Sequence, residues 1–286
     1  MTQLRIPAVY MRGGTSKGVF FRKDALPADP AVRDRILLRV VGSPDPYGKQ
    51  IDGMGAATSS TSKVVLLSKS TRPGCDVDYL FGQVAIDRPF IDWSGNCGNL
   101  TSAVGPYAVS EGLVESPQEG VAVVRIWQAN IGKRIIAHVP VRGGEVVEEG
   151  DFRLDGVTFP AAEIRIEFLE PGGGDDDGDG GAMFPTGRVV DTLDVPGVGH
   201  IEATLINAGN PTVFVTAGSL GLKGAELQRD VNGDAALLAR PAHPLRRLRS
   251  PTMGGGRAAG SGRLCRIVAS TNRQRGREPV SARRVW

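Results

Sequence analysis

The chain has 286 residues, of which 41% are hydrophobic and 23% charged, as in ordinary globular proteins. These values exclude a wholly disordered chain, and no apolar run approaches the roughly 18 residues of a membrane-spanning helix. The N-terminal residues carry no long apolar run of the secretory-signal type. Glycine is frequent, with 39 residues, and its frequency predicts a turn-rich fold.

The formal net charge of +3 conceals an uneven distribution. Residues 241–286 contain 11 Arg and one acidic residue, a net charge of +10, so residues 1–240 carry a net charge of −7. Such an asymmetry requires the two segments to be interpreted separately.

The three cysteines are Cys75, Cys97 and Cys265. They cannot form a closed disulfide framework, and their spacing matches no zinc pattern. The three histidines are scattered along the chain. We therefore expect a reduced, cytoplasmic protein without a metal site.

Short runs rich in Val, Ile, Tyr and Phe, separated by Gly, Pro, Asn or Asp, predict a mostly β structure for residues 1–240. Strands at this spacing favour a barrel or sandwich component. The predicted strands are residues 4–11, 18–21, 63–67, 77–86, 121–127, 134–141, 162–169, 201–206 and 212–215.

Two helices are predicted within the β-rich part. Residues 29–41 have the apolar spacing of one helical face, with Asp29 as the N-cap, Pro30 at the first position and Gly42 after the end. Residues 100–111 form the second helix, in which Gly105-Pro106 indicates either a kink or a buried, closely packed helix.

The segment 171–182 reads PGGGDDDGDGGA. It offers no side chain to a core, so we interpret it as a solvated boundary between two β-rich parts. A calcium loop is the alternative, but the spacing fits no EF-hand.

Cys97 lies in a Gly/Asn-rich loop directly before the second predicted helix. Unpaired N–H groups at a helix N-terminus stabilise a thiolate and bind carboxylates or phosphates. The alternative is a structural, buried cysteine beside an Asn/Gly cap.

Lys63 follows a run of hydroxyl residues and opens an apolar strand. A partly desolvated lysine can act as a general base, whereas a lysine that snorkels from a strand edge has no such role. Residues 12–18, RGGTSKG, suggest an anion cradle or a hairpin turn. Residues 207–211, NAGNP, have ordinary turn chemistry on their own.

Taken together, these segments resemble the PrpF family. The matching motifs, in order, are RGGTSKGVFF at 12–21, DGMGAATSSTSKVVLL at 52–67, DYLFGQVAID at 78–87, SGNCGNLTSAVGPYA at 94–108 and FPTG…DTLDVPG…NAGNPTVFV across 184–215. The family is similar to 2-methylaconitate cis-trans isomerases, with 4-oxalomesaconate tautomerase and methylitaconate isomerase as relatives.

The resemblance implies an α+β, diaminopimelate-epimerase-like fold. Such a fold has two pseudo-symmetric halves, each a curved, barrel-like sheet around a central helix, with the active site between them. It implies residues 1–180 as the first half, with its central helix after Cys97, and 181–240 as the start of the second half.

The resemblance also implies the site. Lys63 and Cys97 match the family's acid–base pair, and either could remove the proton. The residues implied to bind substrate are Thr15, Ser16, Asn96, Gly98, Asn99 and Asn210.

The implied reaction moves a proton and a double bond in a small unsaturated di- or tricarboxylate and uses no cofactor. A keto–enol tautomerase of the oxalomesaconate type and an inactive remnant are the alternatives. We expect a small carboxylate as the binding partner, without membrane or nucleic acid, and the resemblance leaves a homo-oligomer open.

The resemblance stops near Arg240, inside a predicted helix, whereas domain boundaries normally fall in exposed linkers. Residues 241–286 are rich in Arg, Pro, Ala, Gly and Ser and contain no Lys or Asp. We interpret them as a disordered, non-family tail produced by a frameshift, which leaves the second half incomplete. A genuine basic arm that binds phosphates is the alternative.

The frameshift hypothesis predicts an insertion or deletion near codon 240 of the gene. Resequencing this region, together with translating the two other reading frames downstream, shows directly whether such an insertion or deletion is present. We expect another frame to encode the missing strands and helix of the second half. A clean in-frame read through codon 241 into the same tail would reject the hypothesis.

Overall fold

The computed structural model describes residues 3–172, 183–195, 197–208, 210–234 and 266–270. The chain divides into two compact units, one ending at Leu169 and the other beginning at Glu170, and each is described by itself. Among the described helices, none is long and apolar enough to cross a membrane.

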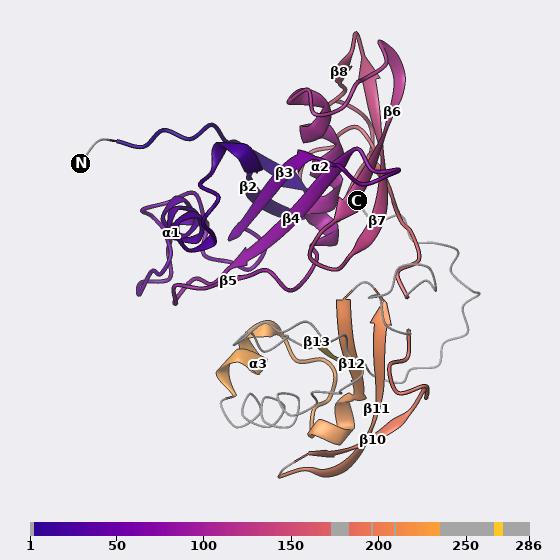
Figure 1. The fold of residues 1–286 in the computed structure, drawn as a ribbon. Helices are drawn as coiled ribbons and strands as arrows, with labels where there is room; N and C mark the ends of the chain where they lie inside the picture. Colours follow the sequence, from indigo (N-terminus) through magenta and orange to yellow (C-terminus); the bar gives the residue numbers. More distant parts are fainter. Residues whose placement is uncertain (1–2, 173–182, 196, 209, 235–265, 271–286) are drawn as a thin grey trace. The chain divides into compact units, whose positions relative to one another are not determined.

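The first unit is built on a nine-stranded sheet (Figure 1). Its main path runs β1-β2-β3-β4-β6-β7-β8, while β5 pairs with β4 and β9 pairs with β7. The strands are β1 (Val9–Gly13), β2 (Ser16–Arg22), β3 (Lys63–Lys69), β4 (Val77–Val84), β5 (Ile91–Asp92), β6 (Glu119–Gln128), β7 (Lys133–Arg142), β8 (Glu145–Val146) and β9 (Arg165–Phe168), and a 3-10 turn, η1 (Lys23–Ala25), follows β2.

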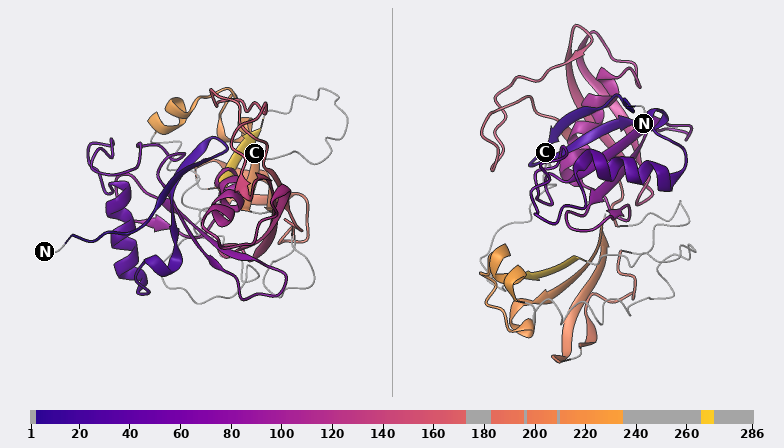
Figure 2. Two further views of the ribbon diagram at one scale, coloured as in Figure 1. Left: turned by 90° about the horizontal axis from the view of Figure 1, so that it is seen from above. Right: turned by 90° about the vertical axis from the view of Figure 1, so that its left-hand side faces the viewer.

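Helix α2 (Gly98–Ser110) lies inside the curve of this sheet (Figures 1 and 2). It contacts β1 and β2 at one end of the strand order and β7, β8 and β9 at the other. One helix can reach both ends only because the sheet curls around it. Nine of the thirteen residues of α2 are buried, so α2 is the central helix that the resemblance implied.

Helix α1 (Pro30–Val41) covers the outer face of the sheet. The side chain of Asp29 accepts a hydrogen bond of 2.9 Å from the backbone N–H of Ala31, which caps the helix. Gly42 ends it with φ 86°, in the left-handed region that glycine adopts without strain. The predicted cap, length and end of this helix are confirmed.

The alternation of side chains along a strand assigns each residue to one face. On β3, Val65 and Leu67 pack into the core around α2, whereas Val64 and Leu66 pack into the core under α1. Both faces of the sheet are therefore buried at its centre, which explains why residues 64–67 of β3 are all apolar.

Helix α2 begins two residues earlier than predicted and passes through Pro106. Of the two alternatives predicted from Gly105-Pro106, the structure shows the buried, closely packed helix. A Cβ atom at Gly105 would lie 2.7 Å from Val139 Cγ2 and 2.9 Å from Ala137 Cβ, so glycine lets the helix touch β7.

The second unit contains β10 (Asp191–Val195), β11 (Gly199–Ala208) and β12 (Asn210–Thr216) as an antiparallel series. A 3-10 turn, η2 (Ala217–Leu220), and a short helix, α3 (Gln228–Gly233), follow. A small apolar core forms around Val195, Ile201, Leu205 and Val213. Its described residues hold no long helix comparable to α2.

One strand arises where none was expected. Residues Arg266–Ser270 form β13 and pair in parallel with β12, although we predicted no regular structure after residue 240. The sequence RIVAS contains two adjacent β-branched residues, which favour an extended strand. The remaining residues of the Arg-rich tail, and the acidic loop 173–182, lie outside the described residues.

Other differences are small. The strand predicted from residue 4 begins at Val9, and the short strands β5, β8 and β10 were not predicted. The fold class is as expected, an α+β structure with a curled sheet around a central helix.

The contact at Gly105 predicts a steep dependence of stability on side-chain volume. Gly105→Val should lower the free energy of unfolding by about 2–3 kcal/mol, because the added carbons overlap a well-packed strand. Urea unfolding followed by circular dichroism measures it. Gly218→Val is the matched control, since a Cβ there meets no atom within 4 Å; equal stability of the two variants would contradict the packing argument.

Candidate active site

Lys63 is the first residue of β3 and is only 7% exposed. By the alternation along the strand, its side chain shares the α2-facing side with Val65 and Leu67. Its Nζ donates a hydrogen bond of 2.6 Å to Gln83 Oε1 and lies 5.0 Å from the ring centre of Phe81. The ammonium group is therefore held inside the curled sheet, and the snorkelling alternative is wrong.

Gln83 holds this lysine in one orientation. It lies directly opposite Lys63 in the β3–β4 register. While its Oε1 accepts from the lysine, its Nε2 donates to the backbone carbonyl of Ser62 at 2.9 Å. Both ends of the amide are thus used, so its acceptor oxygen is fixed toward Nζ.

Cys97 is the N-cap residue of α2. Its Sγ accepts the backbone N–H of Leu100 at 3.5 Å, and its carbonyl accepts the Thr101 hydroxyl at 2.9 Å. The half-buried thiol packs against the core around α2. It therefore lies at the positive end of a 13-residue helix.

Lys63 and the first turn of α2 meet over Gly18 on β2. A Cβ atom at Gly18 would lie 3.0 Å from Leu100 Cδ1 and 3.2 Å from Lys63 Cβ. Without a side chain at this position, the lysine and the start of the helix approach each other. The two predicted acid–base residues thus belong to one end of the same concave face.

The β1–β2 turn joins the same region. Asn99 Nδ2 donates to Thr15 Oγ1 at 2.9 Å and lies 3.5 Å from Ser16 Oγ. Asn96 Oδ1 lies 3.4 Å from the Thr101 hydroxyl, and Gly98 is the first residue of α2. Five of the six predicted substrate-binding residues therefore surround the helix N-terminus.

Asn210, the sixth, belongs to the second unit. It begins β12, and its carbonyl accepts the Thr212 hydroxyl at 3.0 Å. Its participation in the site stays a prediction.

Asn130 ties the loop before Cys97 to the sheet, and no motif pointed to it. Its Oδ1 accepts the backbone N–H of Phe81 at 2.8 Å. Its Nδ2 donates to Phe81 O at 2.9 Å and to Trp93 O at 2.7 Å. Trp93 in turn donates its indole N–H to Asp34 on α1 at 3.0 Å. The strand beneath the lysine and the loop that carries the cysteine are therefore clamped by one amide.

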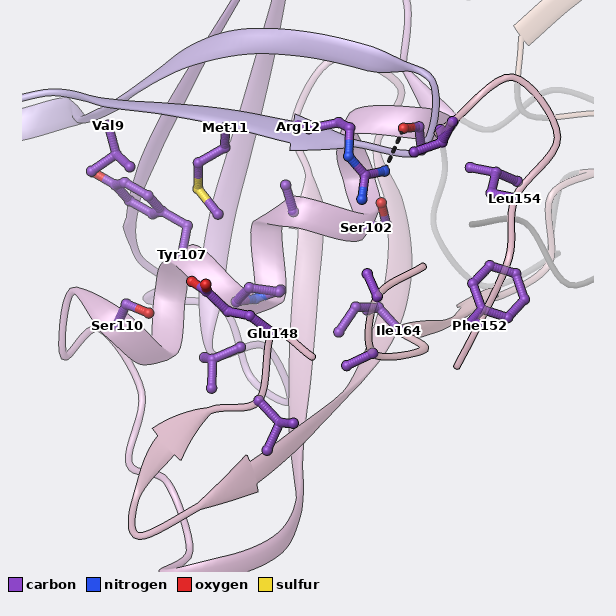
Figure 3. A pocket seen from close by; sticks show the side chains of 18 of the residues that line it. Val9, Met11, Arg12, Ser102, Tyr107, Ser110, Glu148, Phe152, Leu154 and Ile164 are labelled. Carbon is purple, nitrogen blue, oxygen red and sulfur yellow. Dashed lines mark hydrogen bonds between the residues drawn. The ribbon is translucent and has the colours of Figure 1, made fainter. Parts of the chain in front are cut away.

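A cavity of about 490 Å³ lies elsewhere in the first unit (Figure 3). It is bounded by β1, the exposed side of α2 and the segment 146–164, and its lining includes Met11, Tyr107, Phe152 and Ile164. Neither Lys63 nor Cys97 lines it, and its walls mix apolar side chains with polar ones such as Arg12, Ser102 and Glu148. Because it contains neither of the predicted acid–base residues, it is not part of the candidate site.

The model of the family described as PrpF protein matches residues 3–263. The chain belongs to the PrpF family. The match includes all the predicted site residues and runs past Arg240, where we expected the resemblance to stop. Within the described residues, no group of three or more His, Cys, Asp or Glu side chains could hold a metal ion.

Individual members of the PrpF family show how close the similarity is. A 2-methyl-aconitate isomerase of Cupriavidus necator is 67% identical over 244 residues, which cover 83% of this chain and 61% of the relative. A 4-oxalomesaconate tautomerase of Pseudomonas putida is 43% identical over 240 residues, 84% of this chain and 63% of the relative. The crystal structure of a methylitaconate-delta-isomerase has 40% identity and a TM-score of 0.62, covering 86% of this chain and 61% of that one.

This chain thus spans 61–63% of the length of the two curated relatives. The similarity of fold to the methylitaconate-delta-isomerase extends over both units.

The clamp by Asn130 predicts a large loss of stability when its amide is removed. Asn130→Ala leaves the buried polar groups of Phe81 and Trp93 without partners, and we expect the free energy of unfolding to fall by about 3 kcal/mol. Thermal and urea denaturation measure it. Ser116→Ala, at a residue outside the helices and strands, is the control and should change nothing. A neutral Asn130→Ala would show that the clamp is not structural.

Proposed function

We propose that the protein is an isomerase that moves a proton and a double bond in a small unsaturated di- or tricarboxylate such as 2-methylaconitate. The observation that carries the proposal is the buried Lys63, held by Gln83 on the concave face where α2 begins at Cys97. The 67% identity to a 2-methyl-aconitate isomerase supports the substrate class.

In the proposed reaction, one of Lys63 and Cys97 removes a proton from a carbon conjugated with a double bond and a carboxylate. The electron pair delocalises into the conjugated system, and the former double bond becomes free to rotate. A proton returned to the anion completes the isomerisation, so no net proton is gained or lost. Groups that exchange protons near neutral pH suit both steps.

The N-terminal turn of α2 has a second role in the proposal. Its backbone N–H groups, from Gly98 onward, stabilise the charge that develops on the substrate carboxylate. Thr15, Ser16, Asn96 and Asn99 bind and orient the carboxylates, and Asn210 stays a further proposed substrate-binding residue. The chemistry uses no metal or organic cofactor.

A keto–enol tautomerase of the 4-oxalomesaconate type is the alternative within the family, supported by the 43% identity to such an enzyme. Both reactions begin with abstraction of a proton beside an unsaturated carboxylate, so Lys63 and Cys97 serve either. The alternative of a different kind is an inactive remnant whose basic tail binds anions.

We further propose a cytoplasmic protein that acts in propionate catabolism through the methylcitrate cycle. Its partner is the carboxylate substrate, and we expect it to bind neither a membrane nor nucleic acid. Light scattering on the purified chain measures whether it forms a homo-oligomer.

Proton exchange tests the function directly. The purified full chain is incubated with 2-methylaconitate, aconitate or 4-oxalomesaconate in D₂O, and deuterium incorporation and isomer ratio are followed by NMR. We expect exchange and isomerisation of 2-methylaconitate. Preferred turnover of oxalomesaconate identifies the tautomerase, and the absence of exchange with all three in a folded sample identifies the remnant.

The role of Lys63 makes a specific prediction for turnover. Lys63→Ala should lower kcat by about 10²–10⁴-fold or more, the usual contribution of a positioned acid or base. Lys69→Ala is the matched control, because Lys69 is an exposed lysine at the other end of the same strand. A Lys63→Ala enzyme with a near-normal rate would reject the assignment.

A further inference from the structure

Tyr79 lies in the centre of β4 and is fully buried. On the described part of the chain, its hydroxyl is the buried side-chain polar atom for which no hydrogen-bond partner exists. An unpaired hydroxyl in a protein interior costs free energy, and phenylalanine would fill the same space without that cost. The cost of burying this hydroxyl indicates that it has a role other than filling the core.

Tyr79 faces helix α2 from the sheet. Tyr79 shares the α2-facing side of β4 with Phe81 and belongs to the core against which Cys97 packs. Burial raises the pKa of Tyr79 well above its usual value, and the negative charge of a Cys97 thiolate raises it further, while the Thr101 hydroxyl lowers it. The phenol therefore lies within electrostatic reach of the cysteine and keeps its own proton.

Thr101 does not occupy the hydrogen-bonding capacity of Tyr79. The Thr101 hydroxyl donates at 2.9 Å to the carbonyl of Cys97, and Asn96 Oδ1 lies 3.4 Å from it. Its proton is thus used on the loop that carries the cysteine. The Thr101 oxygen still has lone pairs, but no hydrogen bond joins the two hydroxyls, so the Tyr79 O–H is uncommitted in the resting protein.

Titratable groups meet the start of α2 from two strands. From β3, Lys63 lies beside the start of the helix, and from β4 the neighbour is Tyr79. The strands β6 and β7 present apolar side chains to α2, among them Val124, Ala137 and Val139. The backbone N–H of Leu100 is the donor already directed at Sγ.

We propose that Tyr79 is a positioning residue that donates a hydrogen bond to Sγ of Cys97 when the thiol has given up its proton. The thiolate then accepts two donors, the Leu100 N–H and the Tyr79 O–H. The thiol proton goes to the substrate carbanion and returns in the reverse step, while Tyr79 keeps its own proton throughout. Hydrogen bonds to a charged acceptor are stronger than those to a neutral one, so the phenol stabilises the thiolate more than the thiol. This role of Tyr79 rests on Cys97 acting as an acid or base in the proposed function.

Alkylation of Cys97 tests the proposal without any assay of turnover. In the full-length Cys75→Ser, Cys265→Ser background, iodoacetamide reacts with the thiolate of Cys97, and peptide mass spectrometry follows the rate at pH 7. We expect Tyr79→Phe to slow alkylation by about tenfold, since the smaller stabilisation leaves less thiolate. Its unfolding midpoint should equal or exceed that of the parent, because the hydroxyl that disappears is unpaired in the resting protein.

Tyr107→Phe is the matched control. Tyr107 is 2% exposed and belongs to the same core, but lies near the other end of α2, so its variant should alkylate at the parental rate. Replacing Tyr79 with 3-fluorotyrosine, which is a stronger donor of nearly the same size, should speed alkylation. This second variant keeps the proposal testable if Tyr79→Phe does not fold.

Parental alkylation rates in both Tyr79 variants would overturn the proposal, because they would show that the hydroxyl does not stabilise the Cys97 thiolate. Where the wild-type protein isomerises its substrate, Tyr79→Phe should lower kcat and leave KM unchanged. Slower alkylation in a protein that shows no proton exchange would retain Tyr79 as the partner of Cys97 and reject the proposed isomerase.

Discussion

The close approach of α2 to the sheet is the constraint on which the rest of the first unit depends. At Gly13 a Cβ atom would lie 2.5 Å from the carbonyl oxygen of Asn99, and at Gly105 it would overlap β7. Glycine at these positions lets helix and strand backbones touch, so the sheet can close around a helix that is buried on most sides. The curl in turn brings the β1–β2 turn onto the start of the helix, where the candidate site forms.

Once this packing is in place, strand alternation decides which side chains meet. Lys63 and Gln83 continue the α2-facing side of β3 and β4, but they lie beyond the last apolar layer. The helix N-terminus supplies partial positive charge at the same end. Lys63 and the helix start at Cys97 are therefore brought to one end of the concave face by the geometry of one helix and two neighbouring strands.

The parts of the fold that depend on local chemistry could be predicted from the sequence. Helix α1 was predicted from its Asp29 cap and apolar spacing, and most of the strands from their β-branched runs. The start of α2 was missed by two residues because Cys97, which is not a typical capping residue, fills the cap position. Lys63 and Cys97 were identified through motif resemblance, whereas spacing alone left each with a structural alternative.

Gln83, Asn130 and Tyr79 could not be predicted, because their roles arise from pairing across long sequence separations. Gln83 is 20 residues from Lys63, and Asn130 is 49 residues from Phe81. Neither carries a local signal, and Tyr79 is part of a strand whose pattern indicates only a core residue. The strand β13 was missed for the same reason, since five residues of ordinary composition become a strand only beside the free edge of β12.

The buried polar groups of the first unit are concentrated in a way that stability alone does not explain. Gln50 accepts the Ser62 hydroxyl at 2.8 Å and donates to Ser43 at 2.9 Å, and the Ser62 carbonyl in turn holds Gln83. A continuous set of hydrogen bonds therefore runs from the loop beside α1 to the ammonium group of Lys63. Apolar side chains of similar volume would pack these positions at lower cost. Their position at one end of the core suits the proposed role of Lys63, because a flexible ammonium group cannot be aimed at a substrate unless its acceptor is itself held in place.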